Sequence, residues 1–305
     1  MIQIRNVTKT FPGVVALDNV SFEIQSGEFF GLLGPNGAGK STLMNILVGY
    51  RDADSGETII DGQRVTQGGL DTRMSIGLVP QSLALYEEIS AQENLEIFGS
   101  FYHVERKTLR EKIKEQLEAV QLYDRRKDKV ETFSGGMKRR LNLVAGLLHD
   151  PAILLCDEPT VGVDPQSRNA IFEFLQKLNK EGKTIVYTTH YMEEVERLCN
   201  RIAIIDFGKV IAGGTIEEVL QKLPFEESIF ITKNQLTEGK IGLFQEMSSV
   251  IDEESYWELK LRPGIRLSEF FGLAERNGVS NTAIELRKPT LEAVFLHLTG
   301  RRLRD

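Results

Sequence analysis

The amino-acid sequence predicts an α/β fold with a mainly parallel sheet at its centre, an antiparallel sheet near the N-terminus, a helical insertion and a small C-terminal α+β domain. Three observations support this prediction. Nearly continuous apolar runs alternate with helical stretches, which is typical of parallel strands buried on both faces: Phe29–Leu33, Ile76–Val79, Ala152–Cys156 and Thr184–Thr188. A long block with helical periodicity interrupts these runs, and after about residue 225 the pattern changes to short alternating segments.

The N-terminal elements are expected to pair as antiparallel strands. Residues 2–7 and 20–25 alternate between apolar and polar side chains and are separated by turn residues. The helical insertion is expected over about residues 83–147. It contains a capping-box sequence from Ser90 to Glu93, and residues 105–120 carry charges with the period of a helix.

The elements after the insertion continue the alternation of helix and strand. Asp164 and Pro165 supply an N-cap carboxylate and a first-turn proline to a helix that is expected to end near Asn179. Residues 201–214 predict two strands joined by a turn at Asp206-Phe-Gly208. These elements complete the expected α/β domain.

The C-terminal segment is expected to fold separately. It alternates at residues 228–232, 256–261 and 282–286, and it is helical at 267–276 and 290–298. We place the boundary at Leu223-Pro224, which gives domains of residues 1–224 and 225–305. Thr290 is expected to cap the last helix, whose inward residues would be Leu291, Val294, Phe295 and Leu298.

Composition narrows the class of protein. The net charge of −7 over 305 residues disfavours a nucleic-acid partner, which usually requires a basic face. Two cysteines are too few for a disulfide framework, and Cys156 lies in an apolar run, so a reduced, buried thiol and a cytosolic location are expected. No run reaches the roughly 18 apolar residues of a membrane span, and the N-terminus lacks the apolar core of a signal peptide.

A glycine-rich loop predicts a phosphate site. It matches the pattern GxxxxGK[ST] and lies between an apolar strand and a helix, the context that disfavours a merely structural turn. Its residues are Gly34, Pro35, Asn36, Gly37, Ala38, Gly39, Lys40 and Ser41. The glycines allow backbone N–H groups to surround a β-phosphate, Lys40 adds a cation toward the β- and γ-phosphates, and Ser41 offers a hydroxyl to Mg²⁺.

Polar residues at the ends of other strands are candidates for the chemistry. Asp157 and Glu158 follow a buried strand at the edge where ligands bind in such sheets, so Asp157 would hold Mg²⁺ and Glu158 would orient or deprotonate water. By itself such an acidic pair is more often a solvated strand end. Gln81 and His190 also follow strands and could reach a γ-phosphate, although either could equally be a local hydrogen-bonding residue.

A second stretch, ETFSGGMKRRL at residues 131–141, also has the composition of a phosphate site. Ser134, Gly135 and Gly136 precede a basic helix, so free backbone amides are expected at a helix start. The three basic residues Lys138, Arg139 and Arg140 are expected to form a solvated face. One chain would thus carry two phosphate-binding devices far apart in sequence.

The order of these segments resembles the nucleotide-binding subunits of ABC transporters over about residues 1–222. The resemblance rests on the loop 34–42, Gln81, the segment 134–136, the acidic strand 153–158, Val163-Asp-Pro165 and His190. It implies a P-loop NTPase with a RecA-like core that binds and hydrolyses ATP with Mg²⁺. Thr42 would join the phosphate loop and Phe11 would stack on adenine, while core packing remains an alternative for Phe11. Ser41, Gln81 and Asp157 would be the metal ligands, and Lys40, Glu158 and His190 the catalytic residues.

The resemblance also implies a dimer of two copies, or of this chain and a homologous ATPase. Two ATP molecules would lie head to tail between the subunits, with Ser134, Gly135 and Gly136 contacting nucleotide bound mainly by the partner, and with Asp164 at the same interface. The chain departs from the usual Leu-Ser-Gly-Gly-Gln, because Phe133 and Met137 flank the Ser-Gly-Gly. Hydrolysis is still expected, since the hydroxyl and the backbone donors remain.

Within that family the chain looks like the ABC-2-type exporter subunits, because of FSGGMKRRL, His190-Tyr-Met-Glu-Glu194 and the segment from Pro289 to Gly300. This implies a separate membrane permease as partner, a location on the cytoplasmic face of the membrane, and a C-terminal helix that could support the dimer. The permease would dock near the apolar residues Leu83, Leu85, Tyr86 and Ile89, although burial in the core of the chain itself is an equal alternative for any one of them.

Other functions remain as alternatives. The chief one is a soluble ABC ATPase acting on nucleic acid or ribosomes; the single cassette and acidic balance disfavour it. A module that senses ATP without turnover is disfavoured by Glu158, and a GTPase by the lack of an Asn/Thr-Lys-x-Asp segment.

Overall fold

The computed structural model describes residues 1–223, 228–234, 237–262, 264–287 and 290–300. The chain divides into two compact units, the first covering Met1–Ile216 and the second beginning at Glu217. The domain boundary predicted at residue 224 lies outside the described residues. Among the described residues, no helix combines the length and the apolar character needed to cross a lipid bilayer.

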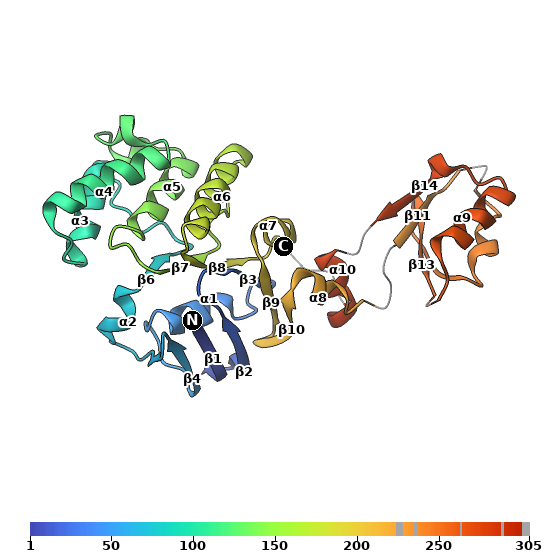
Figure 1. The fold of residues 1–305 in the computed structure, drawn as a ribbon, viewed down its shortest axis with the longest axis horizontal. Helices are drawn as coiled ribbons and strands as arrows, with labels where there is room; N and C mark the ends of the chain where they lie inside the picture. Colours follow the sequence, from blue (N-terminus) through green and yellow to red (C-terminus); the bar gives the residue numbers. More distant parts are fainter. Residues whose placement is uncertain (224–227, 235–236, 263, 288–289, 301–305) are drawn as a thin grey trace. The chain divides into compact units, whose positions relative to one another are not determined.

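The first unit is built on the predicted parallel sheet, drawn at the centre of that unit in Figure 1. Its strand order is β10-β9-β3-β8-β7-β6, and only the β9–β10 hairpin is antiparallel. Every residue of β3, β7 and β8 is buried, which explains their nearly continuous apolar sequences. The strands are β3 (Phe29–Leu33), β6 (Ile76–Val79), β7 (Ile153–Asp157), β8 (Thr184–Thr189), β9 (Arg201–Asp206) and β10 (Lys209–Thr215).

A second, antiparallel sheet carries the N-terminus, as the alternating sequence predicts. Its order is β2-β1-β4-β5, with β1 (Ile2–Phe11), β2 (Val14–Ile24), β4 (Ser55–Ile60) and β5 (Gln63–Arg64). Its inward residues share one apolar core with the parallel sheet and with α1 (Lys40–Leu47). This common core holds the phosphate loop, which runs from β3 into α1, rigidly between the two sheets.

The helical insertion gathers α3, α4 and α5 on the side of the unit away from β1 and β2 (Figure 1). Ser90 forms the predicted capping box with Glu93, and Asp164 and Pro165 begin α6 as predicted. Besides α1, the helices of this unit are α2 (Leu70–Met74), α3 (Ala91–Phe101), α4 (Arg106–Ala119), α5 (Gly135–Ala145), α6 (Pro165–Lys180) and α7 (Met192–Leu198), with short 3₁₀ turns η1 (Tyr123–Arg125) and η2 (Val130–Thr132).

The second unit contains the predicted α+β elements. Its antiparallel sheet has the order β12-β13-β11-β14, and Phe270 and Ala274 of α9 lie in its apolar core. The last strand begins two residues later than predicted because Ser280 caps a 3₁₀ turn there. The elements are β11 (Ser228–Thr232), η3 (Ile241–Phe244), β12 (Ser248–Asp252), β13 (Tyr256–Leu261), α9 (Leu267–Arg276), η4 (Asn281–Ala283) and β14 (Ile284–Arg287).

Two short helices flank this sheet in the sequence, α8 (Ile216–Leu220) and α10 (Leu291–Thr299). Thr290 caps α10 as predicted, and Leu291, Val294 and Phe295 are buried. The inward placement of Leu298 was wrong, because its side chain is 39% exposed. Its spacing from Val294 and Phe295 continues the buried stripe, but it lies in the last turn of α10, just before the C-cap Gly300. Pro289, part of the segment that suggested the exporter subgroup, lies outside the described residues.

Candidate functional site

The phosphate loop adopts a conformation that only glycine permits at key positions. Gly39 has φ 108° and is the N-cap of α1, and a side chain there would meet the carbonyl oxygen of Ala16. A side chain at Gly34 would meet the carbonyl oxygen of Ile205. A Cβ at Gly37, by contrast, would have nothing within 4 Å. The loop is therefore packed tightly at its two ends and open at its middle, where an anion can approach the backbone amides.

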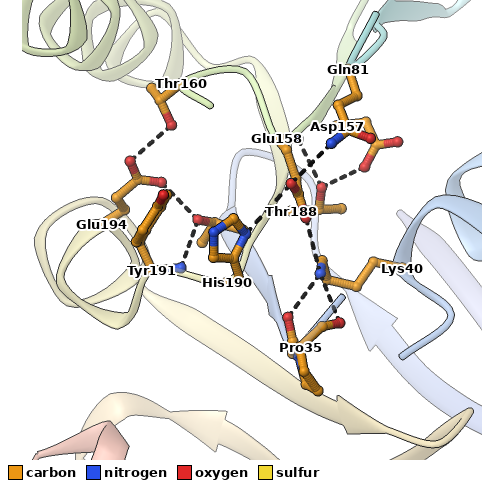
Figure 2. A network of polar contacts seen from close by, with 12 residues as sticks. Pro35, Lys40, Gln81, Asp157, Glu158, Thr160, Thr188, His190, Tyr191 and Glu194 are labelled. Carbon is orange, nitrogen blue, oxygen red and sulfur yellow. Dashed lines mark hydrogen bonds and ion pairs between the residues drawn. The ribbon is translucent and has the colours of Figure 1, made fainter. Parts of the chain in front are cut away.

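Lys40 lies at the centre of this loop. Its side chain is only 4% exposed, and Nζ donates hydrogen bonds to the carbonyl oxygens of Gly34 (2.8 Å) and Pro35 (3.1 Å). Nζ also lies 3.0 Å from Oε1 of Glu158 (Figure 2). The buried ammonium group is thus matched by a carboxylate and two carbonyl oxygens, the compensation that a buried charge requires.

The predicted catalytic residues Lys40 and His190 and the predicted metal ligand Gln81 all lie near the carboxylate of Glu158 (Figure 2). Gln81 Nε2 donates to Glu158 Oε2 at 3.2 Å, and His190 Nδ1 lies 3.5 Å from the same oxygen without hydrogen-bond geometry. Glu158 has φ 46°, in the left-handed region that a non-glycine residue adopts at some cost in energy. This strained backbone turns its carboxylate toward Lys40, Gln81 and His190, which follow three different strands.

Asp157 lies beside this cluster and is fixed by Thr188. Thr188 Oγ1 donates to Asp157 Oδ1 at 2.6 Å and accepts from the backbone N–H of Glu158 at 3.0 Å. Ser41 and Gln81 are exposed, and Asp157 is 8% exposed. The described residues contain no group of three or more His, Cys, Asp and Glu that could hold a metal. One carboxylate with a hydroxyl and an amide nevertheless fits Mg²⁺, which in phosphate sites takes its remaining ligands from phosphate and water.

The Ser-Gly-Gly segment starts α5 and contacts the start of α6. Ser134 Oγ caps α5 by accepting from the N–H of Met137 at 3.3 Å. A side chain at Gly136 would meet Ser167 and come within 3.0 Å of Asp164 Oδ2, whereas Gly135 faces open space. The backbone N–H of Ser167 hydrogen-bonds Asp164 and lowers the pKa of its carboxyl. Within the described residues, no hydrogen bond or ion pair joins Ser134 or Asp164 to the phosphate loop.

The two unusual flanking residues pack around Arg125. Phe133 is buried, and the Arg125 guanidinium lies 5.2 Å from its ring centroid. Arg125 Nη1 also lies 3.5 Å from Met137 Sδ. Phe133 and Met137 therefore stabilise the turn that presents Ser134.

Phe11 lies at the end of β1 and is half-buried. The Arg51 guanidinium lies 5.4 Å from its ring centroid, and Lys9 Nζ lies 5.9 Å from it. The ring is thus accessible enough to contact a base, and cations surround it. Sequence reasoning did not predict the involvement of Arg51.

Sequence reasoning also missed the residues that hold the Gln81 loop. Arg139 is buried and donates to the carbonyl oxygens of Pro80 (3.2 Å) and Gln81 (2.7 Å), and burial lowers the pKa of its guanidinium. Asn142, one turn further on α5, accepts from the N–H of Ala84 at 3.2 Å. The expectation of a solvated basic face was therefore wrong for Arg139, and also for Arg140, which is half-buried and donates to the carbonyl oxygen of Val120 at 2.7 Å. Arg139 is buried because it binds the carbonyl oxygens of Pro80 and Gln81, a segment far from α5 in the sequence.

The chain is similar in sequence to known ATP-binding transport proteins. The profile described as "ABC transporter" matches residues 17–161. Over the full length of both chains, the sequence is 41% identical to the linearmycin resistance ATP-binding protein LnrL of Bacillus subtilis. It is 37% identical to a Nod factor export ATP-binding protein I of Cupriavidus metallidurans, covering 100% of this chain and 99% of that one.

Solved structures are similar as well. A dimeric, post-hydrolysis structure of the ATP-binding cassette MJ0796 with ADP and Pi has a TM-score of 0.65 and 31% identity, covering 70% of this chain and 98% of that one. The structure of an ATP-binding subunit of an ABC transporter has a TM-score of 0.67 and 27% identity, covering 73% and 92%. Both likenesses confirm the predicted α/β fold.

Proposed function

The chain belongs to the ABC transporter family as an ATP-binding subunit, and on this premise we propose that it hydrolyses ATP as half of a head-to-tail dimer that drives a separate membrane permease. The observation that carries the proposal is the convergence of Lys40, Gln81 and His190 on one buried carboxylate, Glu158, beside the phosphate loop. These side chains combine a phosphate-binding cation, a base and two polar groups at the edge of one sheet.

Each subunit would bind one ATP mainly through its own phosphate loop. The open backbone around Gly37 and the N-terminus of α1 would face the phosphates, and Phe11, at the end of β1, would contact the adenine. Lys40, now paired with Glu158, would exchange that carboxylate for phosphate oxygens. Glu158 is then free to accept the proton of the attacking water, while Gln81 and His190 orient the reacting groups.

Mg²⁺ would be held by Ser41, Asp157 and Gln81, and it supplies neutralisation of charge on the phosphates. The hydrogen bond from Thr188 fixes one oxygen of Asp157 and leaves the other available. The arrangement therefore separates the two acids: Asp157 is held for a cation, and Glu158 is turned toward Lys40 and His190.

The second predicted phosphate site, formed by Ser134, Gly135 and Gly136, would bind the nucleotide of the partner subunit. Among the described residues, Ser134 makes no hydrogen bond to the chain's own phosphate loop, the backbone at Gly135 is open, and the N-terminus of α5 attracts negative charge. Asp164 lies against the same helix start. Closure of the dimer would thus depend on the γ-phosphate, and hydrolysis would open it. The similar MJ0796 cassette is dimeric with ADP and Pi bound, which supports a dimer as the form that handles the nucleotide.

The permease would bind to the helical side of the first unit. Leu83 and Tyr86 are exposed, and Leu85 and Ile89 are half-buried. In the same unit, Tyr50, Arg73 and Tyr102 line a cavity of about 380 Å³ that could receive a partner's helix. Such a partner would place the subunit on the cytoplasmic face of the membrane. The names of relatives, which refer to antibiotic resistance and Nod factor export, support an ABC-2-type exporter.

The replacement Glu158→Gln tests the hydrolytic assignment. It removes the base but keeps an oxygen and an amide in place, so we expect loss of turnover by about a hundredfold or more and an ATP-dependent dimer on size-exclusion chromatography. Glu193→Gln, an exposed acid on α7, serves as the matched control. Rapid hydrolysis by the Glu158 variant would exclude the assignment.

Affinity purification from detergent-solubilised membranes tests the transport assignment. The expected result is co-purification of a protein with several membrane-spanning segments. Recovery of ribosomes or nucleic acid, with no membrane protein, would instead support the soluble alternative.

A further inference from the structure

A buried carboxylate outside the phosphate site connects two segments of that site (Figure 2). Glu194, in the first turn of α7, is 3% exposed. Its Oε1 accepts a hydrogen bond from Thr160 Oγ1 at 2.8 Å. Its Oε2 accepts from Tyr187 OH at 2.9 Å and from Thr189 Oγ1 at 2.7 Å. One side chain on α7 therefore accepts hydrogen bonds from three hydroxyl groups. One of them comes from the segment after β7 and two come from β8.

Each segment leads to a residue with a proposed role at the nucleotide. Thr160 lies two residues after Glu158, in the turn that continues to Asp164 at the start of α6. Thr189 directly precedes His190, and its Oγ1 also accepts from the backbone N–H of Tyr191 at 3.0 Å, so the two neighbours of His190 are tied together. Glu194 thus contacts both the segment that carries Asp164 and the segment that carries His190.

The chemistry of this cluster favours a carboxylate. Each hydroxyl has one proton to donate, and an ionised carboxylate can accept all three. Burial and the neighbouring Glu194 raise the pKa of Tyr187, which keeps its hydroxyl protonated and able to donate. Arg168 Nε lies 3.8 Å from Oε1 and adds a favourable charge without a hydrogen bond. Burying a charged group is costly, and an apolar side chain would avoid this cost if the position only had to be filled. A glutamate here therefore indicates a role in accepting the three hydrogen bonds.

We propose that Glu194 is a positioning residue that fixes the Asp164 segment and His190 relative to each other, so that the partner-facing and phosphate-facing groups of one subunit move together. This inference rests on the proposed function. Glu194 itself touches neither the phosphate loop nor Glu158 through any hydrogen bond in the described residues, and it acts only through Thr160 and Thr189.

The proposal distinguishes two replacements at this position. Glu194→Ala leaves three buried hydroxyl groups without their acceptor and releases both segments. Glu194→Gln keeps an oxygen for Tyr187 and Thr189, and its amide can donate to Thr160, whose proton can then turn to Tyr187 at 3.0 Å. Glutamine should therefore restore most of the positioning, although it removes the charge.

The test measures ATP affinity of the isolated chain, steady-state turnover and thermal melting for both variants, with Glu193→Ala as control. Glu193 lies on the same helix but is exposed. We expect Glu194→Ala to lower kcat by between about tenfold and a hundredfold, as for misplacement of reacting groups by about 1 Å, with little change in ATP affinity. Glu194→Gln should recover kcat to within about threefold of wild type.

A double-mutant cycle separates positioning from stability. Thr160→Val removes the arm that reaches the Asp164 segment, and it should lower kcat in the wild-type background but have little further effect in Glu194→Ala. Thr189→Val should also lower kcat, but it additionally removes the acceptor of the Tyr191 N–H, so its effect in Glu194→Ala should be reduced rather than abolished. ATP turnover by the wild type, and its loss in Glu158→Gln, test the proposed function. These measurements do not depend on how kcat changes in the Glu194 and threonine variants. Unchanged kcat in Glu194→Ala, equal impairment in Glu194→Gln, or full additivity of Thr160→Val with Glu194→Ala would each overturn the proposal.

Discussion

The same substitution, glycine to alanine, is predicted to affect stability differently at two adjacent positions at the start of α5. A Cβ at Gly136 would lie 2.5 Å from Ser167 Cβ and 3.0 Å from Asp164 Oδ2, whereas a Cβ at Gly135 would meet nothing within 4 Å. Rotation of the Ser167 hydroxyl cannot relieve the first contact, because Cβ is fixed by the backbone. Gly136→Ala must therefore move the starts of α5 and α6 apart by about 1 Å, and such overpacking typically costs about 1–3 kcal/mol.

The comparison with Gly135→Ala isolates this term, because replacing glycine by alanine in a helix contributes similar propensity at both positions. For a unit of this size, each kcal/mol lowers Tm by about 2–4 °C, so Gly136→Ala should melt about 2–12 °C below Gly135→Ala. Circular dichroism of the nucleotide-free chain would follow the helix-rich first unit. Trp257 is the single tryptophan of the sequence and belongs to the second unit, so its fluorescence provides an internal control whose transition should not move.

The ATP turnover rate should identify a different effect at Gly135, the position where alanine does not reduce stability. Gly135→Ala should keep its stability yet hydrolyse ATP at least about tenfold more slowly, because its methyl group would occupy the space proposed for the partner's phosphate. Equal melting temperatures for the two variants would refute the packing of α5 against α6. Full turnover by Gly135→Ala would refute the placement of Gly135 at the partner's nucleotide.

Three further predictions concern other parts of the chain. Ser134→Ala should slow turnover by about tenfold or more while ATP affinity of the isolated chain stays the same; collapse of that affinity would contradict action on the partner's nucleotide. His149 donates from Nε2 to the carbonyl oxygen of Ile76 (3.0 Å), its buried Nδ1 has no hydrogen-bond partner in the part of the chain that the structure describes, and burial lowers the pKa of the imidazole. Protonation therefore favours unfolding, so stability should be complete above a pH of about 6.5 and fall as pH drops toward the folded pKa. His149→Gln should show a shallower loss in denaturant titrations between about pH 7 and 5, and an unchanged slope would contradict this. Removal of residues 226–305 should leave ATP binding by the remaining chain intact, as judged by calorimetry, and loss of folding would refute the predicted boundary.

The sequence predicted those parts of the fold that local chemistry determines. The phosphate loop, the buried strands β3, β7 and β8, the capping box at Ser90 and the α6 start at Asp164 were all visible as patterns of neighbouring residues. Contacts between distant segments were not visible. Arg139 looked like part of a solvated face, yet its partners are two carbonyl oxygens nearly sixty residues away. Burial of a charge depends on such tertiary partners, which periodicity along one helix cannot reveal.

The same limit applies to Glu194, which the sequence showed only as one of two adjacent acids after His190. Glu193 and Glu194 have the same side chain and lie in the first turn of the same helix, α7, where a negative charge interacts favourably with the helix dipole. Only the fold separates them: Glu193 is exposed, and Glu194 accepts three buried hydroxyl protons.

The chemistry of Ser134 explains how one residue can serve two subunits. A hydroxyl group has two lone pairs and one proton. The cap of α5 uses a lone pair, since Ser134 Oγ accepts from the N–H of Met137, and no hydrogen bond among the described residues uses the proton. The proton remains available to a phosphate oxygen of the partner's ATP. An aspartate would cap the helix equally well but would bring a negative charge toward that phosphate, and an alanine would provide neither group. The structural role of Ser134 within its own chain and its proposed role toward the partner are therefore compatible, because they use different atoms of the same hydroxyl.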